Sequence, residues 1–273
     1  MGRRADLYLR HGSARIPAQK PGRIRPPPPA PGVVLMAGTC GTKALLFDMD
    51  NTLFDLVGAQ VAACERVVRH LGHTDGDDLF LLFLTGDHGF ESVENIRQYM
   101  EERRIPTNGM YEQACRIYAR EKLRHVTPYP GVIKTLAAVR QQGFAMALVT
   151  DAEHPDALLR LTRCGLAHFF DCMVTCDQVG VKKPAPAPFL AALNAVGAEP
   201  GEALFIGDSP RRDIEPCRNL GIRTVYARYG DRFSRTRDTI GADFTIDRMD
   251  ELLQVIQSLQ AARSSPGTNC GPG

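Results

Sequence analysis

The stretch KALLFDMDNTLFD, residues 43–55, joins a short apolar run to three aspartates. The run Lys43–Phe47 predicts a buried β-strand, because it lacks the alternation of a half-exposed strand. Asp48 and Asp50 follow at the carboxyl end of this strand. Similar apolar runs recur later in the chain and predict further strands. They are Phe144–Val149 (FAMALV), Ala203–Ile206 (ALFI), Ile222–Tyr226 (IRTVY) and, more weakly, Cys172–Thr175.

Helical patterns separate these predicted strands. They cover Val132–Gln141, Pro155–Cys164, Pro188–Val196, Arg211–Leu220 and Met249–Leu259. Strands that alternate with helices at this spacing are typical of a parallel sheet with helices on both faces. The sequence therefore predicts an α/β fold with a doubly wound, Rossmann-like core.

Residues 56–128 interrupt this alternation, because the distance between the first two predicted strands far exceeds that of one crossover connection. The segment contains helical patterns and no convincing strand. The patterns cover Val57–Leu71, Leu79–Leu84, Val93–Arg103 and Met110–Arg124. We expect a helical cap domain over 56–128, inserted into a core domain formed by 43–55 and 129–262.

The two ends of the chain show no core pattern. Residues 1–42 contain seven of the nineteen prolines and carry a charge of +6, which leaves −4 for residues 43–273. We expect disordered tails over 1–42 and 263–273. A proline-rich tail is also a potential ligand for a partner protein. The mildly acidic remainder argues against binding to nucleic acid.

Other classes of protein are disfavoured by what the sequence lacks. No apolar run approaches the roughly 18 residues of a membrane span, and the first residues have no apolar signal-peptide core. The eight cysteines form no C-x-x-C pair and are interpreted as reduced thiols. We expect a cytoplasmic protein with no membrane partner. Met36 offers an alternative translation start close to the first strand.

Polar side chains follow several predicted strands, where open α/β sheets bind their ligands. They are Asp48 and Asp50 after the first strand, Thr150 and Asp151 after FAMALV, Asp208 and Asp213 after ALFI, and Lys182 and Lys183 in a loop between. Carboxylates gathered at one edge repel one another unless a hard cation such as Mg²⁺ lies among them.

These residue types suit the transfer of a phosphoryl group. A carboxylate beside Mg²⁺ can attack phosphorus as a nucleophile. A second carboxylate two residues later can protonate the leaving oxygen and then activate water. The side chains of Thr150 and Lys183 would hold the phosphoryl oxygens.

Four stretches resemble the motifs of the haloacid dehalogenase (HAD) superfamily, in its phosphatase branch with a helical cap. They are FDMDNTLFD (Phe47–Asp55), ALVTD (Ala147–Asp151), VKKPAPAPF (Val181–Phe189) and FIGDSPRRDI (Phe205–Ile214). The resemblance covers about residues 43–262, and the four motifs occur in the family's order.

The resemblance implies a role for each motif residue. Asp48 would be the nucleophile and a Mg²⁺ ligand, and Asp50 the general acid and base, with its backbone carbonyl on the metal. Asp208 would complete the metal site, supported by Asp213. Thr150 would bind the substrate phosphate, and Lys183 would bind phosphate and stabilise charge in catalysis.

Two positions depart from the commonest family pattern. Asp151 stands where asparagine is frequent, and Lys182 lies beside Lys183. We assign the motif lysine to Lys183 because it directly precedes Pro184.

The resulting prediction is a Mg²⁺-dependent phosphatase that hydrolyses a small phosphorylated metabolite through an aspartyl-phosphate intermediate. A dehalogenase is disfavoured, because that chemistry does without an acidic residue at the position of Asp50. Two alternatives stay open: a phosphomutase of the same fold, and a non-catalytic protein that binds a partner through the proline-rich tail. The complete set of motif residues argues against the second.

Overall fold

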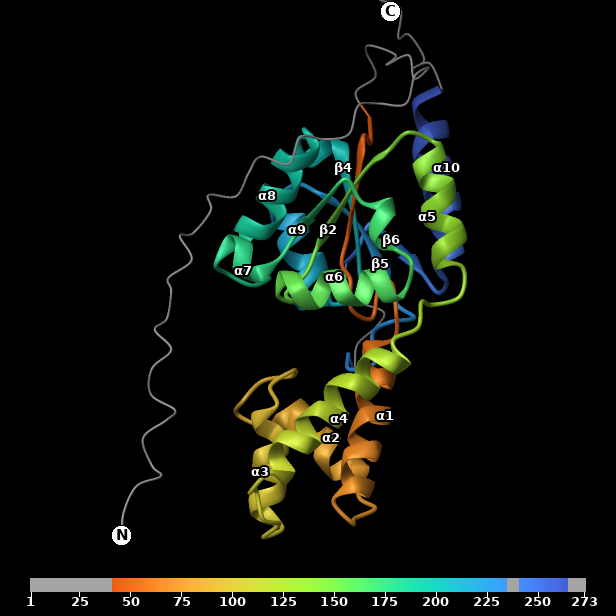
Figure 1. Ribbon diagram of the computed structural model, residues 1–273. Helices are drawn as coiled ribbons and strands as arrows, with labels where there is room; N and C mark the ends of the chain where they lie inside the picture. The colour runs from red at the N-terminus through yellow and green to blue at the C-terminus, as the bar shows by residue number, and fades with distance from the viewer. Residues whose placement is uncertain (1–40, 235–240, 265–273) are drawn as a thin grey trace, which may run out of the picture. The chain divides into compact units, whose positions relative to one another are not determined.

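A six-stranded parallel sheet forms the centre of the computed structural model, which describes residues 41–234 and 241–264, with side chains to residue 261 (Figure 1). The strand order is β3-β2-β1-β4-β5-β6. The strands are β1 (Ala44–Phe47), β2 (Ala145–Val149), β3 (Cys172–Val174), β4 (Ala203–Gly207), β5 (Arg223–Ala227) and β6 (Phe244–Ile246). The five predicted strands are confirmed. Strand β6 was not predicted from the sequence, because three residues at the edge of a sheet show no recognisable periodicity.

The described part of the chain contains ten α-helices. They are α1 (Leu56–His70), α2 (Gly76–Thr85), α3 (Glu94–Glu102), α4 (Met110–His125), α5 (Val132–Gln141), α6 (His154–Arg163), α7 (Cys176–Val179), α8 (Pro186–Val196), α9 (Glu215–Asn219) and α10 (Leu252–Ser264). None of these helices is long and apolar enough to cross a membrane.

The helix predicted over Arg211–Leu220 is shorter than expected. A wide π-helical turn, η3 (Pro210–Ile214), precedes α9, which covers Glu215–Asn219. Pro216 has no backbone N–H and cannot donate the helical bond to Arg212, so the α-helical pattern cannot continue backward through it. The turn leaves Asp213 buried beside the end of β4.

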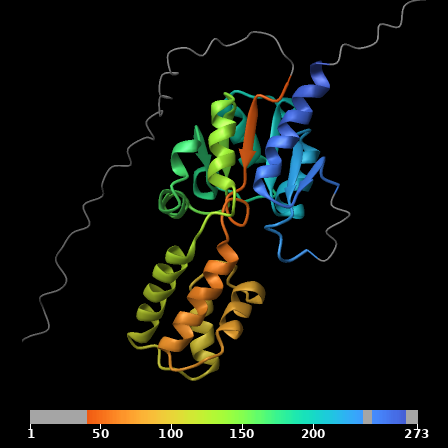
Figure 2. The same ribbon diagram turned by 90° about the vertical axis from the view of Figure 1, so that its right-hand side faces the viewer.

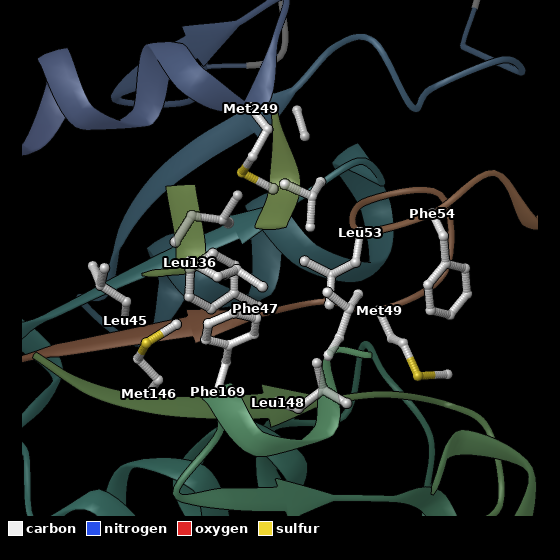
Figure 3. Close-up of a cluster of buried hydrophobic side chains, with 14 of the residues drawn as sticks. Leu45, Phe47, Met49, Leu53, Phe54, Leu136, Met146, Leu148, Phe169 and Met249 are labelled. Carbon is white, nitrogen blue, oxygen red and sulfur yellow. The ribbon is translucent and has the colours of Figure 1, made fainter. Parts of the chain in front are cut away.

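The sheet is buried on both faces, as the apolar strands predict. Successive residues of β1 point to opposite sides, so Leu45 and Phe47 enter one apolar cluster and Leu46 enters another. Helices α5 and α10 cover the first face (Figure 2). Figure 3 shows buried side chains of this layer, such as Leu136 and Met249. Helix α8 packs against the second face. This burial holds the carboxyl end of β1 rigidly in the middle of the sheet.

The four helices α1–α4 form the helical cap inserted between β1 and α5 (Figure 1). They share an apolar cluster of their own, which includes Phe83, Tyr99 and Tyr118. Asp55 begins α1, because its carboxylate accepts a hydrogen bond from the Gly58 backbone N–H at 2.8 Å.

Some predictions fall on residues that the structure does not describe. These include almost all of the predicted tails, 1–42 and 263–273, with Cys40 and Cys270. The six cysteines in the described ranges are free thiols.

Candidate active site

The loop after β1 turns back at once and places its carboxylates beside the sheet edge. Asn51 adopts a left-handed conformation (φ 63°), which asparagine tolerates better than most residues. Its side-chain oxygen accepts a hydrogen bond from the Val57 backbone N–H at 3.1 Å, which ties the turn to α1. Asp48 is buried, and its Oδ2 accepts a hydrogen bond from the Thr52 hydroxyl at 3.0 Å.

Lys183 reaches this loop from the segment before α8. Its Nζ donates to Asp48 Oδ1 at 2.5 Å and to Asp213 Oδ1 at 2.7 Å. Burial alone would lower the pKa of Lys183, but contact with Asp213 and Asp48 raises it. Lys182 is exposed. Of the two adjacent lysines, Lys183 is therefore the one that lies among the motif carboxylates.

Asp151 holds the Lys183 segment in place. Its Oδ1 accepts a hydrogen bond from the Lys183 backbone N–H at 2.8 Å, and its Oδ2 lies 3.5 Å from Arg212. A carboxylate at this position accepts bonds at both oxygens, which gives a physical reason for aspartate in place of the more frequent asparagine.

Asp48, Asp208 and Asp213 form a compact buried cluster. One carboxylate oxygen from each lies within 4.8 Å of the other two. Asp213 uses both oxygens, since Oδ1 accepts from Lys183 and Oδ2 accepts from the Ser209 backbone N–H at 3.0 Å. Burial, with Asp48 and Asp213 close by, raises the pKa of Asp208 well above its usual range.

These three carboxylates fit a hard divalent cation. When ionised they carry three negative charges against the ammonium of Lys183 and the half-exposed guanidinium of Arg212, and buried like charges are costly without a further counterion. Of the three carboxylates, that of Asp208 is the most available to bind a cation. Among the described residues, the hydrogen bond found for it is a 3.5 Å contact with the Thr52 hydroxyl.

Thr150 lies buried at the end of β2. Its backbone N–H donates to the Val174 carbonyl at 3.0 Å, and its hydroxyl oxygen accepts from the Ala152 backbone N–H at 3.1 Å. The hydroxyl proton is then available to donate to a ligand oxygen.

Asp50 points to different partners from Asp48. Its two oxygens accept hydrogen bonds from Arg160 Nη1 at 2.8 and 2.9 Å. Burial raises the pKa of Asp50 to about 6, against the lowering effect of Arg160. The Arg160 guanidinium also contacts Glu91, in the segment between α2 and α3.

Neither Arg160 nor Glu91 was predicted from the sequence. A signal was present for Arg160, because it follows Ala157 by three residues and precedes Leu161 on the apolar side of α6. An arginine on the buried face of an amphipathic helix requires an anionic partner. The segment around Glu91 has no periodicity that would have marked it.

Gly230 is required where the loop after β5 meets the turn that follows β1. A Cβ atom at this position would lie 1.8 Å from the Asn51 carbonyl oxygen. The Asn51 backbone cannot move away without shifting the turn that follows β1. We expect Gly230→Ala to lower the thermal midpoint. Gly201→Ala is the matched control, because a Cβ there has no atom within 4 Å. Equal thermal midpoints for the two variants would contradict this packing.

Known proteins are similar to this chain along most of its length. The family model described as haloacid dehalogenase-like hydrolase matches residues 45–227. The chain is 32% identical over 231 residues to the glyceraldehyde 3-phosphate phosphatase of Methanopyrus kandleri, covering 80% of this chain and 98% of the relative. It is 28% identical over 221 residues to the phosphoglycolate phosphatase of Aquifex aeolicus, covering 79% and 97%. The crystal structure of a HAD phosphatase from Thermococcus onnurineus has a TM-score of 0.56 at 26% identity and covers 79% of this chain and 98% of its own.

Proposed function

This chain belongs to the haloacid dehalogenase-like hydrolases and is a hydrolase of phosphate esters, and from that premise we propose a Mg²⁺-dependent phosphatase that works through an aspartyl-phosphate on Asp48. The observation that carries the proposal is the position of Asp48. It is buried at the carboxyl end of the central strand, accepts a hydrogen bond from Lys183 and clusters with the carboxylates of Asp208 and Asp213.

In the first step, a carboxylate oxygen of Asp48 attacks phosphorus, and the bond from phosphorus to the ester oxygen breaks. The protonated carboxyl group of Asp50 gives its proton to that leaving oxygen. Because burial raises the pKa of Asp50 to about 6, a fraction of this group carries the needed proton near neutral pH. Lys183 and the Thr150 hydroxyl donate hydrogen bonds to the phosphoryl oxygens.

In the second step, water attacks the phosphorus of the aspartyl-phosphate. Asp50, now ionised, takes a proton from this water, and the bond to the Asp48 oxygen breaks. Inorganic phosphate leaves, and both carboxyl groups return to their starting states.

The residues that would hold Mg²⁺ are the carboxylates of Asp48 and Asp208 and the backbone carbonyl of Asp50, with Asp213 supporting them. A bound Mg²⁺ polarises the phosphoryl group and balances its negative charge. The ammonium of Lys183 orients Asp48 and Asp213 through its two hydrogen bonds.

A small phosphorylated metabolite and a cytoplasmic location are part of the same proposal. The two relatives named above differ in the substrate that each is named for, so the family does not select one compound for this chain. A screen of phosphorylated metabolites that measures released inorganic phosphate would identify the substrate. It also separates hydrolysis from a phosphomutase, which transfers the phosphoryl group without releasing it.

Removal of divalent metal is the direct test of this function. We expect EDTA to abolish release of p-nitrophenol from p-nitrophenyl phosphate by the purified full-length protein, and excess Mg²⁺ to restore it. Asp208→Asn is expected to raise the Mg²⁺ concentration needed for half-maximal activity, because it removes a charged ligand. Undiminished hydrolysis in EDTA would contradict the proposed mechanism.

A further inference from the structure

Arg160 is a buried arginine shared by two parts of the chain. Its side chain is 4% exposed and belongs to α6, beside the sheet. Its Nη1 donates to both oxygens of Asp50, from the loop after β1, and contacts Glu91 Oε1 of the helical cap at 3.4 Å. Its Nη2 donates to Glu91 Oε2.

Contacts with other residues of the helical cap fix the position of Glu91. Lys122 of α4 donates a hydrogen bond to Glu91 Oε2 at 2.8 Å. The neighbouring Phe90 carbonyl accepts a hydrogen bond from Gln60 Nε2 of α1 at 2.8 Å. The Phe90 ring also meets the Phe233 ring edge-on, with centroids 6.4 Å apart. The position of Glu91 is therefore set by α1 and α4 and by a contact with the loop after β5.

A buried guanidinium needs both of these anions. Asp50 and Glu91 together neutralise Arg160 and Lys122, so the four side chains form a balanced chain of charges. Removing Glu91 would leave Arg160 with Asp50 as its anionic partner in this group and would free the guanidinium to turn. Because Arg160 binds both Asp50 oxygens, a turn of the guanidinium redirects the Asp50 carboxyl group.

We propose that Arg160 is a positioning residue that aims the Asp50 carboxyl group at the leaving oxygen when Glu91 of the helical cap is in place. The inference rests on the proposed function, in which Asp50 is the general acid and base. It makes the acid step depend on the position of the segment between α2 and α3.

A misdirected Asp50 harms the expulsion of a basic leaving oxygen more than that of nitrophenolate, which leaves with little protonation. We expect Arg160→Gln to lower kcat/KM on phenyl phosphate at least ~10-fold more than kcat/KM on p-nitrophenyl phosphate, within the range of a general-acid contribution. The ratio kcat/KM reports the first step, in which the leaving oxygen departs, and excludes the second step that both substrates share.

The experiment compares the two substrates across a set of full-length variants. Arg160→Lys should show a smaller difference between the two substrates than Arg160→Gln, since the ammonium can still pair with Asp50. Glu91→Gln should produce the same leaving-group selectivity to a smaller extent, and the double variant should be less than additive. Arg163→Gln on α6 and Glu101→Gln in the helical cap are matched controls, because both positions are exposed.

Equal losses of kcat/KM on both substrates would overturn the inference while leaving the proposed function intact. If Arg160→Gln does not fold, as judged by its thermal midpoint, the leaving-group ratio of Glu91→Gln decides the question. Failure of the wild-type protein to release phosphate from either substrate would overturn the proposed function, and this inference with it.

Discussion

Asp48→Asn is expected to abolish turnover, the largest effect of any single substitution considered for this chain. The amide is a poor nucleophile, so the aspartyl-phosphate cannot form. The substitution changes few contacts, because the remaining side-chain oxygen can still accept a hydrogen bond from Lys183. We expect the thermal midpoint to stay close to that of the wild type while phosphate release falls to background.

The measurement for Asp48→Asn is release of inorganic phosphate, with mass spectrometry of acid-quenched enzyme. Asp77→Asn is the control, because Asp77 is exposed in the first turn of α2. Robust turnover by Asp48→Asn would mean that another residue is the nucleophile.

Asp50→Asn is expected to reduce turnover by about 10²–10⁴-fold, the usual contribution of a general acid and base. The nucleophile is intact in this variant, but the proton donor and the base that activates water are missing. With p-nitrophenyl phosphate the first step needs little protonation, whereas the second step still needs the base. We therefore expect the phosphorylated enzyme to accumulate.

Mass spectrometry of the quenched Asp50→Asn enzyme should place the added phosphoryl group on the peptide that contains Asp48. The wild-type enzyme, treated in the same way, is the control and should show far less adduct. A label on serine, threonine or histidine would contradict the assignment of the nucleophile.

Much of the fold could be predicted from local sequence patterns. The strands around Leu45, Met146 and Phe205 are buried on both faces, and such strands have unbroken apolar runs that can be recognised one at a time. The edge strand Phe244–Ile246 escaped recognition because it is short and only partly buried. The turn at Pro210–Ile214 also escaped, since a π-helical turn has no distinctive sequence pattern.

The sequence by itself determined which residue types end each strand, and hence the chemistry that the sheet edge offers. It did so because Asp48, Thr150 and Asp208 directly follow recognisable strands, and parallel strands bring their carboxyl ends to one edge. The tertiary structure alone decided that Asp50 pairs with Arg160, 110 residues away, and through it with Glu91. Such contacts depend on how α6 and the helical cap pack around one loop, and packing between distant segments leaves no periodic trace in either segment.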